Sequence, residues 1–432
     1  MSSEWISTTL GEVTSWMSGG TPKKDVAAYW NGDIPWISAN SMYGTRYSDS
    51  DLRITREGLA NGSRLAPESS VLLLVRGGAL HNRIPVGIAT REVAFNQDVK
   101  ALLAKRDRLN PWYLLFWLMG QERFLLDSVV EFTGIGAGKL DTQRMQALPF
   151  LLPKLEEQNT IVALAKGIDD RITLLRETNT TLEAIAQALF KSWFVDFDPV
   201  HARARGEQPA GLSPEVAALF PDSFEDSELG MVPKGWMVEP LDEIADFLNG
   251  LALQKFPPDG DADLPVIKIA QLRKGDAVGA DRASSKIKPE YIIQSGDVLF
   301  SWSGSLEVEV WCGGEGALNQ HLFKVTSQRF QKWFYLHWTK HHLANFKHIA
   351  ASKATTMGHI QRRHLTEAMV VVPSPEFLVE ADKVFAPLLE QWINNALQAQ
   401  TLATLRDTLL PRLISGQLRL PEAEVTLQEA GI

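Results

Sequence analysis

Residues 164–193 read LAKGIDDRITLLRETNTTLEAIAQALFKSW, and this stretch decides the fold. Apolar side chains recur at spacings of three and four residues, the period of one stripe of a coiled-coil helix. Residues 384–413 carry a matching stripe 220 positions later. The apolar residues that we assign to the seam between the two helices are Leu164, Ile168, Ile172, Leu175, Leu182, Leu189, Leu388, Trp392, Leu402 and Leu409. Gly167 and Pro387 interrupt the two patterns at the same place, which predicts a short helix followed by a long one in each region.

The segment before each stripe is also repeated, so the whole chain reads as an internal duplication. DIPWI at 33–37 matches DLPVI at 263–267, and Asn-Gln occurs at 96–97 and again at 319–320. Short runs such as 71–75, bounded by Gly, Pro and Asn, predict strands in these segments. Each match is short, and two unrelated domains with similar strand patterns are the alternative.

The order of the parts predicts an α+β chain with pseudo-twofold symmetry. Each long helix starts at its own β-rich segment, so a helix pair with one segment at each end must be an antiparallel coiled coil. The predicted parts are a β-rich domain at 1–153, a central helical region at 154–200, a polar linker at 201–235, a second β-rich domain at 236–373, a distal helical region at 374–420 and a tail at 421–432.

Composition excludes several classes of protein. The chain has 432 residues, of which 45% are hydrophobic, and one cysteine, Cys312, which excludes a disulfide framework or a cysteine-based zinc site. No apolar run reaches the roughly 18–20 uncharged residues of a membrane-spanning helix. The first residues have neither a basic start nor an apolar stretch, so we expect a cytoplasmic protein without membrane contact.

The net charge of −9 disfavours a strong DNA binder that acts alone, because Lys and Arg supply most non-specific affinity. The acidity is uneven, however. Residues 1–153 contain 16 Lys and Arg against 15 Asp and Glu, and residues 236–373 contain 15 against 15. The β-rich domains are therefore close to neutral, which is compatible with a member of a larger DNA-binding assembly.

This arrangement resembles the specificity (S) subunit of type I restriction-modification systems. The stretches that carry the resemblance are LGEV at 10–13 followed by SGGTP at 18–22, IPWI at 34–37, NQ at 96–97, PKLEEQ at 153–158 and LEAIAQALFKSWF at 182–194. The second half departs from the pattern, since LNG at 248–250 lacks the following Thr-Pro and EFL at 376–378 replaces Glu-Glu-Gln.

The resemblance implies a subunit without catalysis, in which the β-rich domains are target-recognition domains. Each would read one part of an asymmetric two-part sequence in double-stranded DNA, with a non-specific spacer between the parts. The helices would bind two modification subunits, which methylate adenine with S-adenosylmethionine, and restriction subunits would add ATP- and Mg-dependent translocation and cleavage. No cofactor is expected in this chain. A methyltransferase fused to its own DNA reader, and a non-catalytic scaffold for RNA or protein, are the alternatives.

Three motifs imitate catalytic or metal sites. NPWY at 110–113 resembles an adenine-methyltransferase signature but lacks a glycine-rich cofactor loop, and we interpret it as a helix start with Asn110 as cap and Pro111 in the first position. TGIGAGKL at 133–140 departs from a phosphate loop at both ends. His337, His341 and His342 lack a partnered carboxylate motif for zinc. We predict no catalytic and no metal-binding residues.

The candidate DNA contacts are loop residues that can reach base edges or phosphates. In the first domain they are Lys23, Lys24, Arg46, Arg76, His81, Asn82, Arg83 and Lys139. In the second they are Gln254, Lys255, Gln271, Arg273, Lys274, Ser303, Lys353, Thr355, His359, Gln361 and Arg362. The repeated pairs are Asn96 with Gln97 and Asn319 with Gln320; their amides either close a loop or face DNA.

Overall fold

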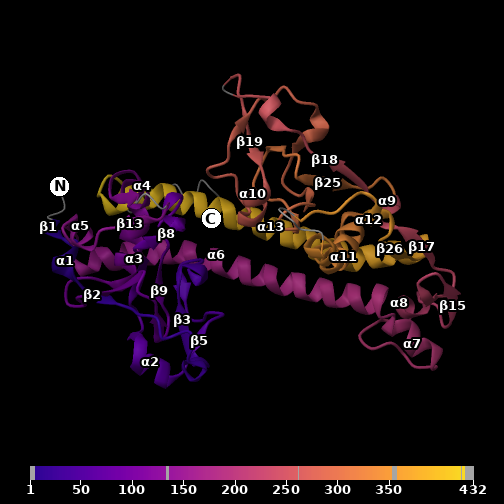
Figure 1. Ribbon diagram of the computed structural model, residues 1–432, viewed down its shortest axis with the longest axis horizontal. Helices are drawn as coiled ribbons and strands as arrows, with labels where there is room; N and C mark the ends of the chain where they lie inside the picture. The colour runs from indigo at the N-terminus through magenta and orange to yellow at the C-terminus, as the bar shows by residue number, and fades with distance from the viewer. Residues whose placement is uncertain (1–4, 133–135, 261, 353–357, 420, 424–432) are drawn as a thin grey trace. The chain divides into compact units, whose positions relative to one another are not determined.

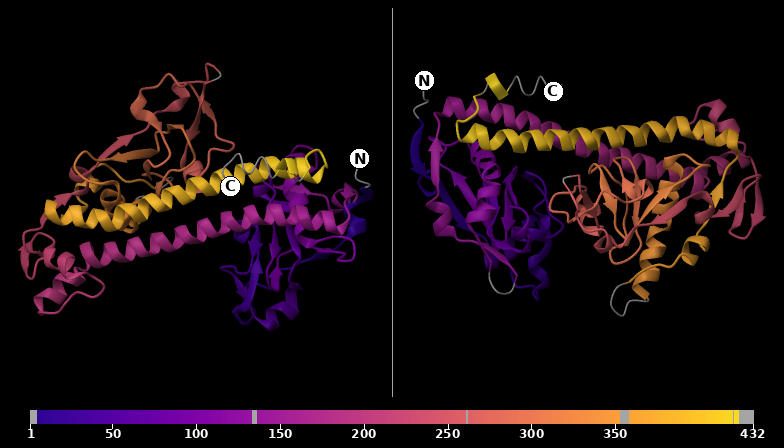
Figure 2. Two further views of the ribbon diagram at one scale, coloured as in Figure 1. Left: turned by 180° about the vertical axis from the view of Figure 1, so that it is seen from behind. Right: turned by 90° about the horizontal axis from the view of Figure 1, so that it is seen from above.

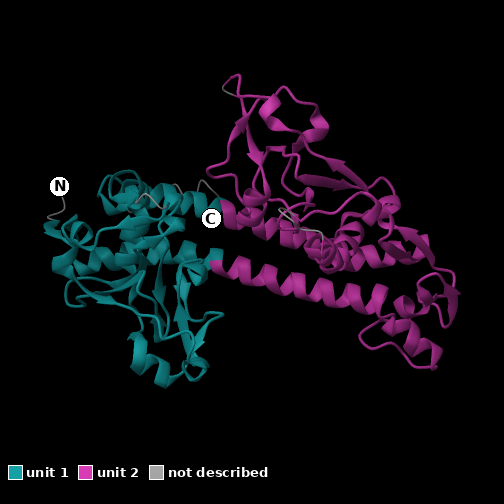
Figure 3. Cartoon of the chain, viewed as in Figure 1, with its two compact units in different colours: residues 1–172, 401–432 teal, residues 173–400 magenta. Residues whose placement is uncertain are grey.

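The computed structural model describes residues 5–132, 136–260, 262–352, 358–419 and 421–423 (Figure 1). The chain mixes helix and sheet and divides into two compact units, which Figure 3 colours separately. Unit 1 comprises residues 1–172 with 401–432, and unit 2 comprises residues 173–400. Among the helices in the described ranges, none combines the length and the apolar character needed to cross a bilayer.

The β-rich part of unit 1 is built from two main sheets. The five-stranded sheet has the order β2 (Thr14–Ser18), β11 (Val99–Ala104), β7 (Val71–Leu74), β9 (Val86–Ala89) and β4 (Arg46–Tyr47). The four-stranded sheet has the order β5 (Arg53–Ile54), β3 (Trp30–Ile37), β10 (Val93–Phe95) and β6 (Arg64–Ala66). All four residues of β7 are buried, as expected for an unbroken apolar run in a central strand.

Helix α3 (Pro111–Gly120) covers the five-stranded sheet and belongs to the same hydrophobic core. The Asn110 side-chain oxygen accepts a hydrogen bond from the Trp112 backbone N–H at 2.8 Å, and Pro111 occupies the first helical position. This confirms the predicted helix start. The two ends of the domain meet in a ribbon, where β1 (Ile6–Thr9) pairs antiparallel with β14 (Pro149–Leu152).

Unit 2 contains sheets with corresponding strand orders. One has the order β18 (Asp246–Asn249), β25 (Leu322–Thr326), β22 (Val298–Ser301) and β23 (Val308–Val310). The other has the order β20 (Arg282–Ala283), β19 (Leu264–Ile267), β24 (Gly316–Leu318) and β21 (Ile292–Ile293). The pair β19–β24 is parallel, as is β3–β10 in unit 1. Here too a ribbon, β17 (Met237–Pro240) with β26 (Met369–Val372), joins the two ends, and α11 (Lys332–Ser352) follows the sheets.

Two long helices, α6 (Leu155–Phe190) and α13 (Pro375–Ile414), contribute to both units. Both are continuous, so the predicted division into a short and a long helix is wrong. Gly167 costs about 1 kcal/mol and Pro387 about 3 kcal/mol in a helix interior. Tertiary packing outweighs these costs: Ile168 is 6% exposed, and Phe385 stacks on Trp333 with ring centroids 4.5 Å apart.

Within each unit a segment of α6 packs against a segment of α13 (Figure 2). In unit 1, Ile161 shares a core with Leu413 and Ile414, and Asp169 bonds Arg406. In unit 2, Asn179 bonds Asn395, while Phe190 lies 6.3 Å from Phe385 between ring centroids. In each unit rising residue numbers on α6 meet falling numbers on α13, so the packed segments run in opposite directions.

The ten predicted seam residues fall into two classes of exposure. The buried ones are Ile168, Ile172, Leu175, Leu402 and Leu409. The half-buried ones are Leu164, Leu182, Leu189, Leu388 and Trp392.

Residues 201–235, which the sequence predicts to be a polar linker, are folded. This stretch takes in most of α7 (Asp198–Ala204), then α8 (Pro214–Leu219) and a hairpin of β15 (Phe224–Ser227) with β16 (Gly230–Pro233). Phe220 is 1% exposed and lies 4.6 Å from Phe377 between ring centroids. The prediction missed this because a few isolated apolar residues in a polar segment are enough to anchor it to the core of unit 2.

Candidate nucleic-acid interface

In unit 1 a small sheet brings two predicted cations together. Strand β8 (Arg76–Gly77) pairs antiparallel with β13 (Gly138–Leu140), and the register sets Arg76 opposite Lys139. Directly opposite residues project from the same face of a sheet. Arg76 is exposed and Lys139 half-buried. The pair can therefore present two positive charges together, the chemistry suited to guanine edges and phosphates.

An aromatic pair lies on the same small sheet. Its third strand, β12 (Val130–Phe132), pairs with β13. The Phe132 ring is 54% exposed and stacks on His81 with ring centroids 4.5 Å apart. The His81 Nε2 atom lies 2.6 Å from the Gly136 carbonyl oxygen. The sequence singled out His81, but Phe132 was missed because an exposed phenylalanine in a strand carries no local signal.

The corresponding place in unit 2 has different chemistry. An isolated antiparallel bridge joins Ser303 to His359. The Ser303 hydroxyl lies 2.9 Å from His321 Nδ1, and the Trp302 ring lies 6.0 Å from the His321 ring between centroids. Trp302 Nε1 donates to the Asn249 side-chain oxygen at 2.9 Å. Among the residues that the structure describes, the members of this cluster are hydroxyl, imidazole, indole and amide groups, and none is Lys or Arg.

Sequence reasoning found Ser303 and His359 in this cluster but missed Trp302, His321 and Asn249. Two of them could have been found from their neighbours in the sequence. Trp302 directly precedes Ser303, and His321 directly follows the repeated Asn-Gln pair.

The repeated Asn residues have the same local role in both units. Asn96 is 7% exposed and its side-chain oxygen accepts from the Asp98 backbone N–H at 3.1 Å. Asn319 is 3% exposed and accepts from the His321 backbone N–H at 3.3 Å. Both arrangements are loop-closing side-chain turns. Of the two Gln residues, Gln97 is exposed and Gln320 is half-buried.

A matched glycine packs against each of these loops. A Cβ atom on Gly19 would lie 2.3 Å from the Asn96 carbonyl oxygen, and one on Gly250 would lie 2.2 Å from the Asn319 carbonyl oxygen. Any larger residue would force the backbone apart. This contact explains physically why a glycine stands beside each of these two loops.

The remaining candidates differ in exposure. The exposed ones are Lys23, Lys24, Asn82, Gln254, Lys255, Arg273, Lys274, Gln361 and Arg362. Two half-buried side chains, Arg83 and Gln271, are engaged by the protein, since Arg83 donates to the Met42 carbonyl and Gln271 accepts from the Lys268 backbone N–H. Lys353 and Thr355 lie outside the described residues.

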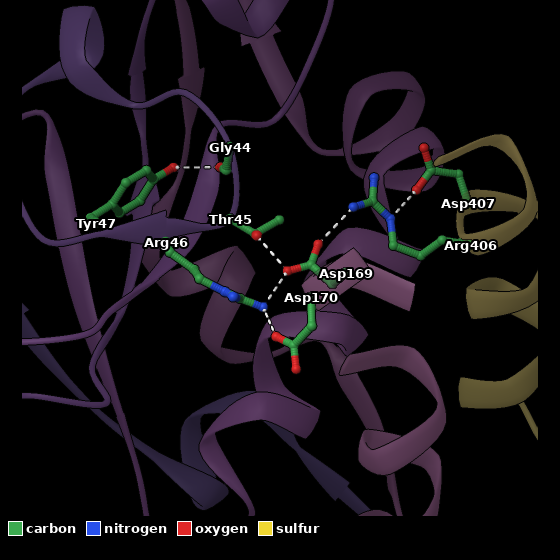
Figure 4. A network of polar contacts seen from close by, with 8 residues as sticks. All are labelled: Gly44, Thr45, Arg46, Tyr47, Asp169, Asp170, Arg406 and Asp407. Carbon is green, nitrogen blue, oxygen red and sulfur yellow. Dashed lines mark hydrogen bonds and ion pairs between the residues drawn. The ribbon is translucent and has the colours of Figure 1, made fainter. Parts of the chain in front are cut away.

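Arg46 is the candidate whose environment differs most from the expectation of a DNA contact. Its guanidinium donates to Asp169 at 3.1 Å and also to Asp170, in the network of Figure 4. Asp169 is 1% exposed and also receives hydrogen bonds from Thr45 and Arg406. The side chain of Arg46 is therefore engaged by two carboxylates of α6.

Three histidines of α11, His337, His341 and His342, pack against aromatic rings. His337 stacks on Phe190 with centroids 5.1 Å apart, and burial, assisted by the charge of Lys340, lowers the pKa of His337 to about 3. Burial, assisted by His341, lowers the pKa of His342 to about 4. In the described part of the chain, no three His, Cys, Asp or Glu side chains are grouped as a metal site would require.

Comparisons with known proteins agree along nearly the whole chain. Residues 2–184 and 233–406 match the family model described as the type I restriction modification DNA specificity domain. The type I restriction enzyme MjaIX specificity subunit of Methanocaldococcus jannaschii is 26% identical over 430 residues, covering 96% of this chain and 92% of that protein. The HindI specificity subunit of Haemophilus influenzae is 26% identical over 326 residues, covering 63% and 70%. The crystal structure of a type I restriction-modification S subunit from M. genitalium has a TM-score of 0.51 and 14% identity, covering 95% and 96% of the two chains.

Proposed function

Because the chain belongs to the family of type I restriction-modification DNA specificity domains and is a non-catalytic DNA-recognition subunit, we propose that it reads a bipartite, asymmetric target in double-stranded DNA. The domain at 1–153 reads one part and the domain at 236–373 reads the other. Family membership favours this function over the two alternatives that the sequence left open, a fused methyltransferase and an RNA or protein scaffold.

One observation supports the proposal that the two halves of the target differ in sequence. Corresponding strand ends present Arg76 with Lys139 in unit 1 and the exposed His359, bridged to the buried Ser303, in unit 2. Arg and Lys favour guanine edges and phosphates, whereas an imidazole offers ring nitrogens with different hydrogen-bonding geometry. Two readers of similar architecture and different edge chemistry would select different bases.

The proposal includes an internal duplication in which α6 and α13 form an antiparallel coiled coil with pseudo-twofold symmetry. Corresponding strand orders, parallel strand pairs at the same place and matched end ribbons support the duplication. The antiparallel contacts of α6 with α13 within each unit support the coiled coil. In this arrangement the helix pair sets the separation of the two DNA half-sites.

The chemistry would be supplied by partner subunits. Two modification subunits bound to the helices would methylate adenine with S-adenosylmethionine, and restriction subunits would use ATP and Mg to translocate and cleave DNA in the cytoplasm. This chain itself would hold no cofactor. Its contribution is to select the target and to position the modification subunits on it.

The test is to co-express the chain with its modification subunits in a host without adenine methylation and to sequence the methylated adenines. Arg76→Ala with Lys139→Ala should relax base preference in one half-site, and His359→Ala should relax it in the other. Each lost base contact should reduce discrimination about tenfold, since a good bidentate contact is worth about 1–3 kcal/mol. Arg123→Ala, on the exposed face of α4 (Glu122–Ser128), is the matched control and should change neither half-site.

Three outcomes would contradict the proposal. These are an undivided target, a target with two identical halves, and variants of either domain that alter both half-sites alike.

A further inference from the structure

A single buried carboxylate in unit 1 joins three secondary-structure elements (Figure 4). Asp169 on α6 has a side chain that is 2% exposed. One of its oxygens accepts from the Thr45 hydroxyl at 2.7 Å and from Arg46 Nη2 at 3.1 Å. Its other oxygen accepts from Arg406 Nη1 of α13 at 2.9 Å. We call Thr45, Arg46, Asp169 and Arg406 the strand–helix latch.

Neighbouring groups hold Arg46 in place. Its guanidinium also bonds Asp170, and its Cζ atom lies 5.3 Å from the centre of the Trp112 ring. Lys166 donates to Asp170 at 2.8 Å and lies 5.2 Å from the same ring centre. Burial opposes ionisation of Asp170, but hydrogen bonds from Lys166 and Arg46 outweigh it and lower the pKa of Asp170. The buried Arg46 Nε has no hydrogen-bond partner, and Nη2 makes the bonds to both Asp169 and Asp170.

Unit 2 lacks this arrangement at the corresponding positions. Arg46 is the first residue of β4, the edge strand of the five-stranded sheet, and Thr45 directly precedes it, whereas the corresponding sheet of unit 2 ends at β23. The residues 220 positions from Asp169 and Arg406 are Leu389 and Ala186. The acid, the arginine and the strand that meets them are thus present in unit 1 and missing together from the described sheet and helices of unit 2.

We propose that the strand–helix latch is a positioning device, which holds the recognition sheet of unit 1 at one orientation on its own helix segments and makes the subunit selective for the spacer between the two half-sites. The inference rests on the proposed function. Apolar packing is non-directional, whereas charged hydrogen bonds require defined distances and angles. A carboxylate shared by a strand and two helices therefore restricts rocking of the sheet, which would otherwise allow the half-site to be met at more than one spacing.

Two variants test the latch in the complex with its modification subunits. Asp169→Asn keeps the shape of the side chain and removes the charge between Arg46 and Arg406. The double variant Asp169→Leu/Arg406→Ala introduces the residues found at the matched positions of unit 2 and leaves Arg46 paired with Asp170, so no isolated charge is buried. Asp127→Asn, whose carboxylate lies 3.7 Å from Arg123 on α4, is the exposed control.

The measurement is competition binding with duplexes that contain both half-sites at the native spacer or at a spacer one base pair longer or shorter. In both latch variants, the ratio of affinity for the native spacer to affinity for the altered spacers should fall about tenfold. This is the order of the effect of one mismatched base pair. Base preference within each half-site should not change, and Asp127→Asn should behave as the parent.

The outcomes separate the latch from the function on which it rests. Unchanged spacer preference in both variants would overturn the latch alone. An equal loss of binding at every spacer would also overturn it, since that result indicates a merely structural role. A parent complex with no bipartite target would overturn both the proposed function and the latch.

Discussion

Asn179→Leu is expected to destabilise unit 2, whereas the double variant Asn179→Leu/Asn395→Leu should recover most of the loss. These two side chains are 8% and 5% exposed and lie between α6 and α13. Asn395 Nδ2 donates to Asn179 Oδ1 at 3.0 Å, and Asn179 Nδ2 donates to the Trp392 carbonyl at 2.8 Å. Such a polar contact inside an apolar seam fixes which residues face each other.

The magnitude follows from these contacts. The single change removes two buried hydrogen bonds worth about 1 kcal/mol each. It also leaves the buried Asn395 Nδ2 donor without an acceptor, at a cost of about 1–3 kcal/mol. The leucine returns about 1–2 kcal/mol of apolar burial, so the free energy of unfolding should fall by about 2–3 kcal/mol. In the double variant no donor is stranded, and the exposed Gln391, which donates to Asn395 at 2.7 Å, can turn to water. That variant should lie within about 1 kcal/mol of the parent.

Thermal unfolding followed by circular dichroism measures both effects, because each kcal/mol shifts Tm by about 2–4 °C in a domain of this size. Asn394→Leu, one residue away and exposed, is the matched control and should lie within about 0.5 kcal/mol of the parent. Asn395→Leu alone should cost a similar amount, so the coupling energy between the two positions should be about 4 kcal/mol. If the costs of the two single variants simply add, within about 0.5 kcal/mol, the amides do not act as a pair and the reasoning is refuted.

Four further predictions concern assembly, DNA binding and pH. Leu402→Asp and Leu175→Asp place a carboxylate at positions that are 0% and 4% exposed, and should reduce complex formation on size-exclusion chromatography for every DNA sequence alike; a full complex with altered base preference would contradict this. The isolated chain, with a net charge of −9, should bind DNA weakly and gain affinity and specificity with its modification subunits, so tight specific binding by the chain alone in physiological salt would refute the expectation. Seven residues inserted near Thr180 and seven near Gln400 add about 10 Å of helix rise and should lengthen the spacer by about two to four base pairs. An active variant with an unchanged spacer in methylome sequencing would show that the helix pair does not set the separation of the half-sites. His337 is neutral when folded and takes up a proton on unfolding below its ordinary pKa of about 6.5, so its contribution to stability is lost as the pH falls from about 6.5 towards the folded pKa of about 3. The loss should reach about 2 kcal/mol at pH 5, and a smaller pH dependence of Tm in His337→Phe measures it.

Local signals predicted much of the fold. The helical character of α6 and the start of α3 at Asn110 depend on residues within a few positions of one another, so period and capping chemistry were enough to predict them. The continuity of α6 and α13 was not predictable in this way. The penalties of Gly167 and Pro387 are local, whereas the packing that outweighs them comes from distant residues such as Trp333.

The candidate interface was predictable in part for the same reason. The similar strand patterns of the two halves directed attention to the strand ends that carry Arg76 and Ser303. It could not show that Arg46 meets an acid 123 positions later, because an exposed cation and a buried one look alike in sequence. The loop-closing role of Asn96 was left open for a related reason, since the burial of its side chain depends on the surrounding fold.

The ribbons at the ends of the two recognition domains have a consequence for how such a chain can evolve. In each domain the first and last strands, β1 with β14 and β17 with β26, lie side by side, so the polypeptide enters and leaves at one place. Everything between the paired strands can therefore be exchanged as a cassette without moving the points of attachment to α6 or α13. Recombination between genes at the sequences encoding these strands would replace one half of a target and leave the other half intact.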